Sequence, residues 1–278
     1  MAEIVALQLT SHTSHMRTHV DTADQGQVGR VVSALETLRQ RLDTARPDVL
    51  LMTGTDHYNN FFLNNEPAIC LGIADSYSGP AQAESHIGVP PRTLPGAGDF
   101  GRTLVGHLLE DGFPVSHSQE LQLDHSLMIP LSYLLPDRAL PFVPIIINDV
   151  APPLPSVRTC WKVGQSIGRF ITSWSGNERV AIVGTGGLSH WVGTPEMGSI
   201  NSDWDDRLLG ILASGQAESL VDWGDSEILE PAGNGAQELR NWMTALGAAG
   251  EGRRAEVLAY EPIEEWLTGI AVVDVPLS

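Results

Sequence analysis

The stretch RVAIVGTGGLSHW, which runs from Arg179 to Trp191, decides the fold of this chain. Its early part, VAIV, is apolar and mostly β-branched, and such a run predicts a buried strand. A turn with three glycines follows, and Ser189 and His190 stand directly behind it. Buried strands of this kind form parallel α/β sheets, which bind ligands just beyond the carboxyl ends of their strands. We therefore expect a functional site at this turn, with His190 as its first candidate residue.

The rest of the chain repeats the alternation of strand and helix. Apolar runs predict further strands at residues 3–9, 48–52, 68–73, 142–147 and 269–275. Apolar residues at helical spacing predict helices at 26–46, 100–110, 156–174, 203–213 and 237–246. The first strand, helix and second strand form a β-α-β unit. The pattern predicts an α/β fold: a single domain over residues 1–278, with a mostly parallel or mixed central sheet flanked by helices.

Two segments depart from this simple alternation. Residues 75–99 are rich in glycine, proline and serine, which predicts a long surface excursion rather than a linker between domains. Residues 114–123 predict a strand that leads into Asp124 and His125. His125 would then follow a strand, as His190 does.

Composition excludes several classes of partner. Of the 278 residues, 42% are hydrophobic, which is enough for a sizeable core. The 16 basic and 34 acidic residues give a formal charge of −18, which repels nucleic acid and anionic membranes, so we expect neither as a partner. The chain lacks a signal-peptide pattern and any apolar run near the roughly 20 residues that span a bilayer. Its two cysteines form no CxxC motif, and together these features predict a cytoplasmic protein.

The glycine turn also permits a nucleotide-binding interpretation. Gly184 and Gly186 match the first two glycines of a GxGxxG fingerprint, but Ser189 stands at the third position. Gly193 and Pro195 argue against a long helix behind the turn, and without a helix N-terminus a pyrophosphate loses its main electrostatic anchor. A nucleotide-binding protein that uses the GTGG turn is therefore the weaker alternative.

A metal site explains more of the sequence. Four histidines each follow a predicted strand, namely His12, His57, His125 and His190. One such histidine is usually a hydrogen-bonded structural residue, but four of them converge at one sheet edge if the strands are parallel. Imidazoles bind iron, zinc, copper and nickel, and two histidines with one carboxylate form the ligand set of non-haem Fe(II) oxygenases. The spacing leaves open which metal binds and which histidines are ligands rather than acids and bases.

Motifs along nearly the whole chain narrow the choice. They are LTSH (9–12), DHYNNFF (56–62), EPAICLG (66–72), DHS (124–126), VPIIIND (143–149), GTGGLSHW (184–191), WDDRLL (204–209) and QELRNWMTALGA (237–248). In this order they resemble the class III extradiol catechol dioxygenases, the superfamily of the protocatechuate 4,5-dioxygenase catalytic subunit. Within it, the chain is most similar to the 2,3-dihydroxyphenylpropionate 1,2-dioxygenase branch.

The resemblance implies roles for five side chains. In the superfamily, the positions of His12, His57 and Glu238 bind Fe(II). Read alone, Glu238 has a simpler explanation, because an acid in the first turn of a helix is favoured by the helix dipole. The positions of His125 and His190 form the acid–base pair, and we assign His125 as the base and His190 as the acid. A histidine titrates near working pH, as a residue that both accepts and donates protons requires.

The resemblance thus predicts a non-haem Fe(II)-dependent extradiol dioxygenase. Its substrates would be O2 and a substituted catechol, whose ring it opens in aromatic compound catabolism. Apolar content and the habit of the family predict a homo-oligomer. The alternative within the same fold is a relative with changed chemistry, which binds zinc or serves as a non-catalytic subunit.

Several residues leave details of the predicted site open. His15 follows His12 in HTSH, and His12 is preferred as the ligand because it directly follows the strand and its serine. Trp191 stands where many relatives have glutamine, and Ser126 where many have glycine, so the substrate is open. Asp56 and Asp124 are candidates to orient the histidines that follow them, although solvated acids explain them equally well.

Overall fold

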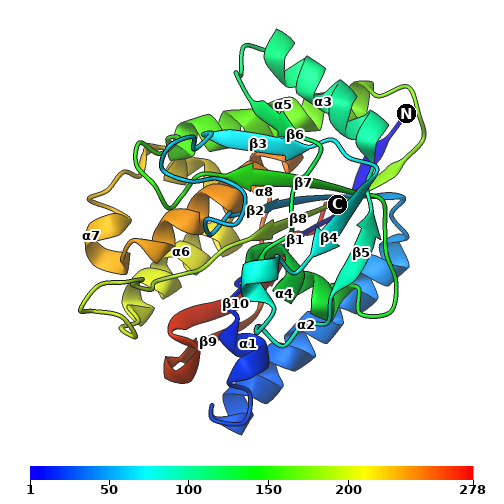
Figure 1. Ribbon diagram of the computed structural model, residues 1–278. Coiled ribbons are helices and arrows are strands. Elements are labelled where there is room, and N and C mark those ends of the chain that lie inside the picture. Colours follow the sequence, from blue (N-terminus) through cyan, green and yellow to red (C-terminus); the bar gives the residue numbers. More distant parts are fainter. Residues whose placement is uncertain (278) are drawn as a thin grey trace.

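The computed structural model describes residues 1–277 and has an α/β architecture. Within these residues, eight strands form one mixed sheet (Figure 1). From edge to edge they are β6 (Ser116–Ser118), β3 (Ile69–Gly72), β7 (Phe142–Ile147), β2 (Val49–Gly54), β8 (Arg179–Thr185), β1 (Glu3–Thr10), β10 (Thr268–Asp274) and β9 (Glu256–Ile263). The central strands β7, β2, β8 and β1 are parallel, whereas β3 and β10 run antiparallel to their neighbours in this centre. The predicted α/β class with a mixed central sheet is confirmed.

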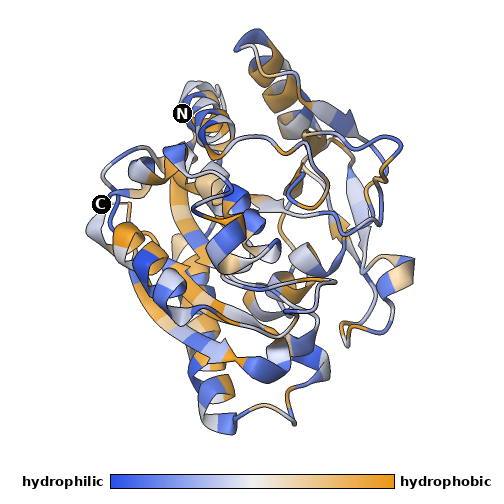
Figure 2. Ribbon diagram, turned by 90° about the vertical axis from the view of Figure 1, so that its left-hand side faces the viewer, coloured by the Kyte–Doolittle hydropathy of each residue, from blue (hydrophilic) through white to orange (hydrophobic). Residues whose placement is uncertain are grey.

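Helices cover both faces of the sheet, and each face has its own apolar core. In Figure 1, α2 (Gln25–Ala45) and α4 (His125–Leu134) lie below the sheet, and α3 (Gly98–Glu110) and α5 (Val157–Ser173) lie above it. The core of the α3 and α5 face also contains side chains of α6 (Ser202–Ser214) and α8 (Leu239–Ala249). Side chains alternate between the two cores along a strand, so Leu51 joins the α8 side while Leu50 and Met52 join the α2 side. Figure 2 accordingly shows strands that are mostly hydrophobic.

Shorter elements complete the fold. They are the helices α1 (His15–Thr18) and α7 (Leu229–Ala232), the 3-10 turns η1 (Gln82–Glu84), η2 (Ala217–Asp222), η3 (Gly235–Glu238) and η4 (Glu264–Trp266), and the two-stranded sheet of β4 (Ser76–Gly79) and β5 (Arg92–Pro95). No helix within residues 1–277 has the length and apolar character needed to cross a bilayer.

The strongest sequence patterns predicted their elements well. The strand expected at 142–147 is β7 itself, and the helix expected at 26–46 is α2, which Asp24 caps through its carboxylate and the amide of Gln27. The expected β-α-β unit is present, but its strands β1 and β2 are not adjacent because β8 pairs with both. Strand β9 was missed: it lies at the edge of the sheet and is only partly buried, so it lacks a continuous apolar run.

The prediction of a surface excursion at residues 75–99 was wrong in part. This segment forms β4, η1 and β5, and Tyr77, Ile87, Val89 and Leu94 are buried in the core on the α2 side. Single apolar side chains spaced among glycines and prolines have no strand or helix period, so the composition hides their burial.

The strand expected at 114–123 was also predicted too long. Only Ser116–Ser118 pair with β3, at the far edge of the sheet. His125 is therefore not at a strand end but opens α4, whose N-cap is Asp124. Asp124 accepts a hydrogen bond from the amide of Ser126 at 2.9 Å, which is the usual way an aspartate starts a helix.

Candidate active site

The register of three central strands places His12 and His57 at the same edge of the sheet. Gly184 of β8 lies opposite Leu9 of β1 on one side and opposite Thr53 of β2 on the other. The three parallel strands therefore end level with one another. His12 follows β1 and His57 follows β2 after a few residues each, so both side chains emerge at this carboxyl edge.

The glycine turn after β8 supports Glu238 by close backbone approach. A Cβ at Gly186 would lie 2.9 Å from the carbonyl oxygen of Glu238, and one at Gly187 would lie 3.0 Å from its Oε2. The amide of Gly187 donates a hydrogen bond to the same Oε2. Only residues without a side chain allow this contact. Glu238 itself ends η3 at the start of α8, which is buried along its whole length.

The same turn fixes His190. Its backbone amide donates to the carbonyl oxygen of Ala232 at 2.9 Å, and its ring Nδ1 lies 3.0 Å from the carbonyl oxygen of Leu188. Residues 186–201 contain no helix, so the turn lacks the helix N-terminus that a phosphate loop needs. The glycines therefore position two side chains rather than cradle a pyrophosphate.

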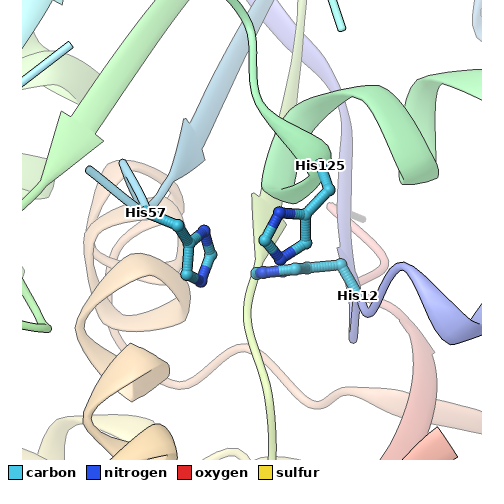
Figure 3. A group of neighbouring side chains, drawn as sticks. All are labelled: His12, His57 and His125. Carbon is cyan, nitrogen blue, oxygen red and sulfur yellow. The ribbon is translucent and has the colours of Figure 1, made fainter. Parts of the chain in front are cut away.

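Two imidazoles and a carboxylate meet at the centre of this edge. Nε2 of His12 and Nε2 of His57 each lie 3.5 Å from Oε1 of Glu238. His125 joins them from α4, and one ring nitrogen of each of the three histidines lies within 4.8 Å of those of the others (Figure 3). The ring of His125 stacks on that of His57 at 4.1 Å between centroids. Geometry alone thus offers two ligand triads, one with Glu238 and one with His125 as third member.

Carboxylates orient two of the histidines, but not in the way that the sequence predicted. Asp124 accepts from Nδ1 of His57 at 2.8 Å and so orients His57 rather than the adjacent His125. Asp56 accepts instead from the amides of Asn60 and Phe61 and shapes the loop behind His57. A carboxylate on Nδ1 fixes the proton there and leaves the Nε2 lone pair free.

The partner of His125 is Glu84, which sequence analysis missed. Oε1 of Glu84 lies 2.6 Å from Nδ1 of His125, and its Oε2 accepts from the backbone amide of His125 at 2.6 Å. Glu84 is buried in η1, inside the segment that the sequence assigned to the surface. Glu84 and His125 are 41 residues apart in the sequence, so no local pattern predicts that they pair.

Burial and neighbouring charges shift the pKa values of the residues at the site. Burial lowers the pKa of His12 to about 3, although Glu238 opposes that shift. Burial also disfavours the charged form of His57, but the carboxylates of Asp124 and Glu238 outweigh it and raise the pKa of His57 well above its usual value. For Glu238, the neighbouring histidines outweigh burial and hold the pKa well below its usual value. The site therefore keeps a carboxylate and a neutral imidazole side by side.

Asp149 is a further buried acid behind these residues. Its Oδ2 accepts from the hydroxyl of Thr55 and from the amide of Asn241, both at 2.8 Å, while its Oδ1 has no partner. Burial, together with the charge of Glu238, raises the pKa of Asp149 to about 8. Both effects favour the protonated form of Asp149, in which Oδ2 still accepts from Thr55 and Asn241.

This state of Asp149 predicts the effect of two substitutions on stability. Asp149→Asn keeps the acceptor oxygen and the neutral charge, and it should change the free energy of unfolding by less than about 1 kcal/mol at pH 7. Asp149→Ala removes the acceptor of the Thr55 hydroxyl and one of the two acceptors of the Asn241 amide, and it should cost about 2 kcal/mol or more. Urea unfolding of the metal-free variants measures both. Equal losses in the two variants would contradict a protonated Asp149.

The five predicted residues line one cavity of about 240 Å³. His12, His57, His125, His190 and Glu238 form part of its wall, and Trp191, Val192, Met197, Trp266 and Leu267 form most of the rest. A wider hollow of about 690 Å³ lies between α2 and β9, but it contains no histidine and only one ion pair, Arg30 with Glu261. The smaller cavity is therefore the candidate active site.

His15 lies at this cavity without joining the ligand cluster. Its Nδ1 lies 2.8 Å from the carbonyl oxygen of Glu265, and its ring stacks on His19 at 4.0 Å. His12, by contrast, is buried against Glu238. Of the two histidines in HTSH, only His12 is thus beside the candidate third ligand.

The carboxyl edge of this α/β sheet thus carries histidines and a carboxylate in one pocket, a group of side chains that could hold a metal ion. The family described as the catalytic LigB subunit of aromatic ring-opening dioxygenase matches residues 6–271. The chain belongs to this family, the class III extradiol dioxygenases. It is therefore an aromatic ring-opening dioxygenase.

Curated relatives agree with the family over nearly their whole length. The chain is 29% identical to a protein of Photorhabdus laumondii named 2,3-dihydroxyphenylpropionate/2,3-dihydroxicinnamic acid 1,2-dioxygenase, with 97% of this chain and 96% of the relative covered. It is 29% identical to an Azotobacter vinelandii protein of the same name, with 97% and 98% covered. Among solved structures, an uncharacterized protein from Escherichia coli K12 matches with a TM-score of 0.62 at 14% identity over 97% of this chain, which shows a shared fold.

Proposed function

We propose that the protein is an Fe(II)-dependent extradiol dioxygenase that opens the ring of a substituted catechol with O2. One observation carries the proposal: Nε2 of His12, Nε2 of His57 and Oε1 of Glu238 converge, with 3.5 Å between Glu238 and each imidazole. This is the two-histidine, one-carboxylate set that leaves coordination positions open in non-haem Fe(II) oxygenases. His12, His57 and Glu238 are therefore our ligand assignment.

The donor atoms fit a metal ion. A charge-assisted hydrogen bond would be about 2.7–2.9 Å long, so the 3.5 Å separations are too long for strong ones. Ligand atoms bound at about 2.0–2.2 Å to one ion lie about 3–3.5 Å apart, which agrees with the two separations from Glu238. Glu238 is buried, and a buried carboxylate needs a cation nearby. Fe(II) bound there would hold a catechol and O2 in adjacent positions.

His125 is suited to the role of base. Glu84 takes the proton-bearing Nδ1 and leaves Nε2 free to accept the proton that a catechol hydroxyl loses on binding. The stack on His57 holds the ring next to a proposed ligand and therefore next to a bound catechol. Glu84 is in this view a positioning residue, since it acts through His125.

His190 is suited to the role of acid. It follows β8 and lines the same cavity, and the carbonyl oxygen of Leu188 at 3.0 Å from Nδ1 leaves Nε2 for the substrate. The ring lies against Gly187 and Gly235, where any larger residue would collide with it. His190 would return a proton to oxygen as the ring opens. We further expect a cytoplasmic homo-oligomer that takes part in aromatic compound catabolism.

Anaerobic reconstitution tests the function. Metal-free protein is loaded with Fe(II) or, as a control, with Zn(II), and then mixed with oxygenated buffer and a panel of catechols. We expect O2 uptake and a yellow ring-opened product with Fe(II) and not with Zn(II). Absence of O2 uptake with every catechol, in protein that has bound one equivalent of Fe(II), would refute the proposal and favour a relative with changed chemistry.

The close packing of Gly235 against His190 gives a second prediction. A Cβ at Gly235 would overlap the His190 imidazole, so Gly235→Ala should displace the ring. We expect turnover to fall at least about tenfold, with an overpacking cost of about 1–3 kcal/mol. Gly210→Ala is the matched control, because a Cβ at this exposed position of α6 meets no atom within 4 Å. Oxygen uptake and thermal unfolding measure both; wild-type turnover in Gly235→Ala would contradict the role of His190.

A further inference from the structure

The part of the cavity wall that the histidines and Glu238 leave free is largely apolar. Its apolar members are Trp191, Val192, Met197, Trp266 and Leu267, and Thr13, Ser14 and Thr268 add hydroxyl groups. Trp266 is buried, whereas Val192 and Met197 are exposed and form the rim. A catechol whose hydroxyl groups face the histidines would place its ring substituent against these side chains.

No lysine or arginine of the described chain lines this cavity. The two arginines nearest in sequence to its lining residues are held elsewhere. Arg17 donates to the hydroxyl of Ser132 at 3.0 Å, and its guanidinium lies 3.9 Å above the ring of Tyr133. Arg240 is buried and donates to the carbonyl oxygen of Pro155 at 2.6 Å. Neither arginine lines the cavity to pair with a substrate carboxylate.

The remaining polar groups of the wall do not replace a cation. His15 uses Nδ1 on the carbonyl oxygen of Glu265, and burial lowers the pKa of His15, so the ring is neutral. The hydroxyl of Thr268 lies 3.2 Å from the carbonyl oxygen of Gly269. The exposed acids Glu196 and Glu265 directly precede the lining residues Met197 and Trp266, on a chain with a formal charge of −18. The sequence neighbours of the lining residues therefore add negative rather than positive charge to this region.

We infer that the preferred substrate is a catechol whose ring substituent is uncharged and apolar, an inference that rests on the proposed function. The relatives above are named for a propionate and a cinnamic acid, both of which carry a carboxylate. An apolar substituent gains free energy when it leaves water for this wall, whereas a carboxylate loses hydration and finds no cation.

A matched pair of catechols isolates the charge. The probes are 2,3-dihydroxyphenylpropionate and its methyl ester, which share the ring and the chain but differ in charge. Binding to Fe(II)-loaded protein without O2 is followed by quenching of tryptophan fluorescence, and kcat/KM by O2 uptake. We expect the ester to bind at least about tenfold more tightly and to react at least about tenfold better. An acid that binds as tightly as the ester would overturn the inference.

Unsubstituted catechol separates the two ways to fail. If the loaded enzyme prefers the acid to the ester, or opens the acid alone, the substrate class is wrong and the proposed function stands. If it opens none of the three catechols, the proposed function itself is wrong. Preference for the ester supports both the substrate class and the proposed function.

A charge added at the rim should shift the preference. Met197→Lys places an ammonium group at the cavity rim, and Met197→Gln is a control of similar length without charge. At low salt we expect Met197→Lys to raise the ratio of acid to ester affinity at least about threefold, and Met197→Gln to leave it unchanged. An equal shift in both variants, or none in Met197→Lys, would contradict a cavity that selects by charge.

Discussion

Glu238→Gln is expected to lose Fe(II), whereas His125→Asn is expected to keep it. Both His12 and His57 lie 3.5 Å from Oε1 of Glu238, and Gln replaces one carboxylate oxygen by an amide nitrogen that cannot bind a cation. Loss of a ligand should weaken metal binding by more than the roughly 10–100-fold seen when an outer partner is removed. Metal content after equilibrium dialysis measures this without reference to activity.

The same experiment decides between the two triads that geometry offers. Three ring nitrogens, of His12, His57 and His125, also lie close enough to hold an ion, and three histidines form a ligand set of zinc enzymes. His12→Ala and His57→Ala should lose metal under either assignment. Loss of metal from His125→Asn, with retention in Glu238→Gln, would make His125 the third ligand and remove it as the base. We expect the reverse because Oε1 of Glu238 lies 3.5 Å from Nε2 of both His12 and His57, and a carboxylate brings negative charge to a bound cation.

Glu84→Gln should lower kcat about 10- to 100-fold while Fe(II) content and KM stay near their wild-type values. A carboxylate accepts from both Nδ1–H and the backbone amide of His125, but an amide has only one acceptor oxygen. In the variant, two arrangements are open to the Gln side chain. It leaves either Nδ1–H or the backbone amide of His125 without an acceptor, or its amide nitrogen donates to Nδ1 and the ring proton of His125 moves to Nε2. The second arrangement removes the lone pair that the base needs.

Metal content and a distant acid provide the controls for Glu84. Glu84, Asp124 and His125 also form a group that could hold an ion, so loss of Fe(II) from Glu84→Gln would assign Glu84 to metal binding instead. Glu120→Gln changes an exposed acid away from the cavity and should leave kcat unchanged. A wild-type kcat in Glu84→Gln would show that His125 does not depend on its partner. A loss of kcat without loss of metal, absent from the control, supports a positioning role.

The amino-acid sequence predicted the parts of the site that depend on local pattern. Apolar runs mark β1, β2 and β8, and a residue shortly after the end of a parallel strand must lie at the carboxyl edge. That logic was sufficient to bring His12, His57 and His190 together. Glu238 came from the resemblance rather than from physics, because a glutamate in the first turn of a helix has an ordinary electrostatic explanation.

Other parts of the fold left little trace in the sequence. The edge strand β9 is partly exposed and lacks an apolar run, and the buried side chains of residues 75–99 have no period. His125 reaches the site from the first turn of α4 and not from a strand, although the sequence placed it after one. Its convergence with the other histidines was predicted correctly for the wrong reason.

The sequence by itself determined the α/β class, the sheet edge that carries the chemistry and the side chains that converge there, because strand period and strand-end position are local properties. Only the tertiary structure decided which carboxylate binds which histidine. Asp124 is paired with His57 rather than with the adjacent His125, and His125 is paired with Glu84. It also decided that the wall of the cavity is apolar and lacks a cation. Such pairings join segments far apart in the chain, and their geometry exists only once helices and loops have packed around the sheet.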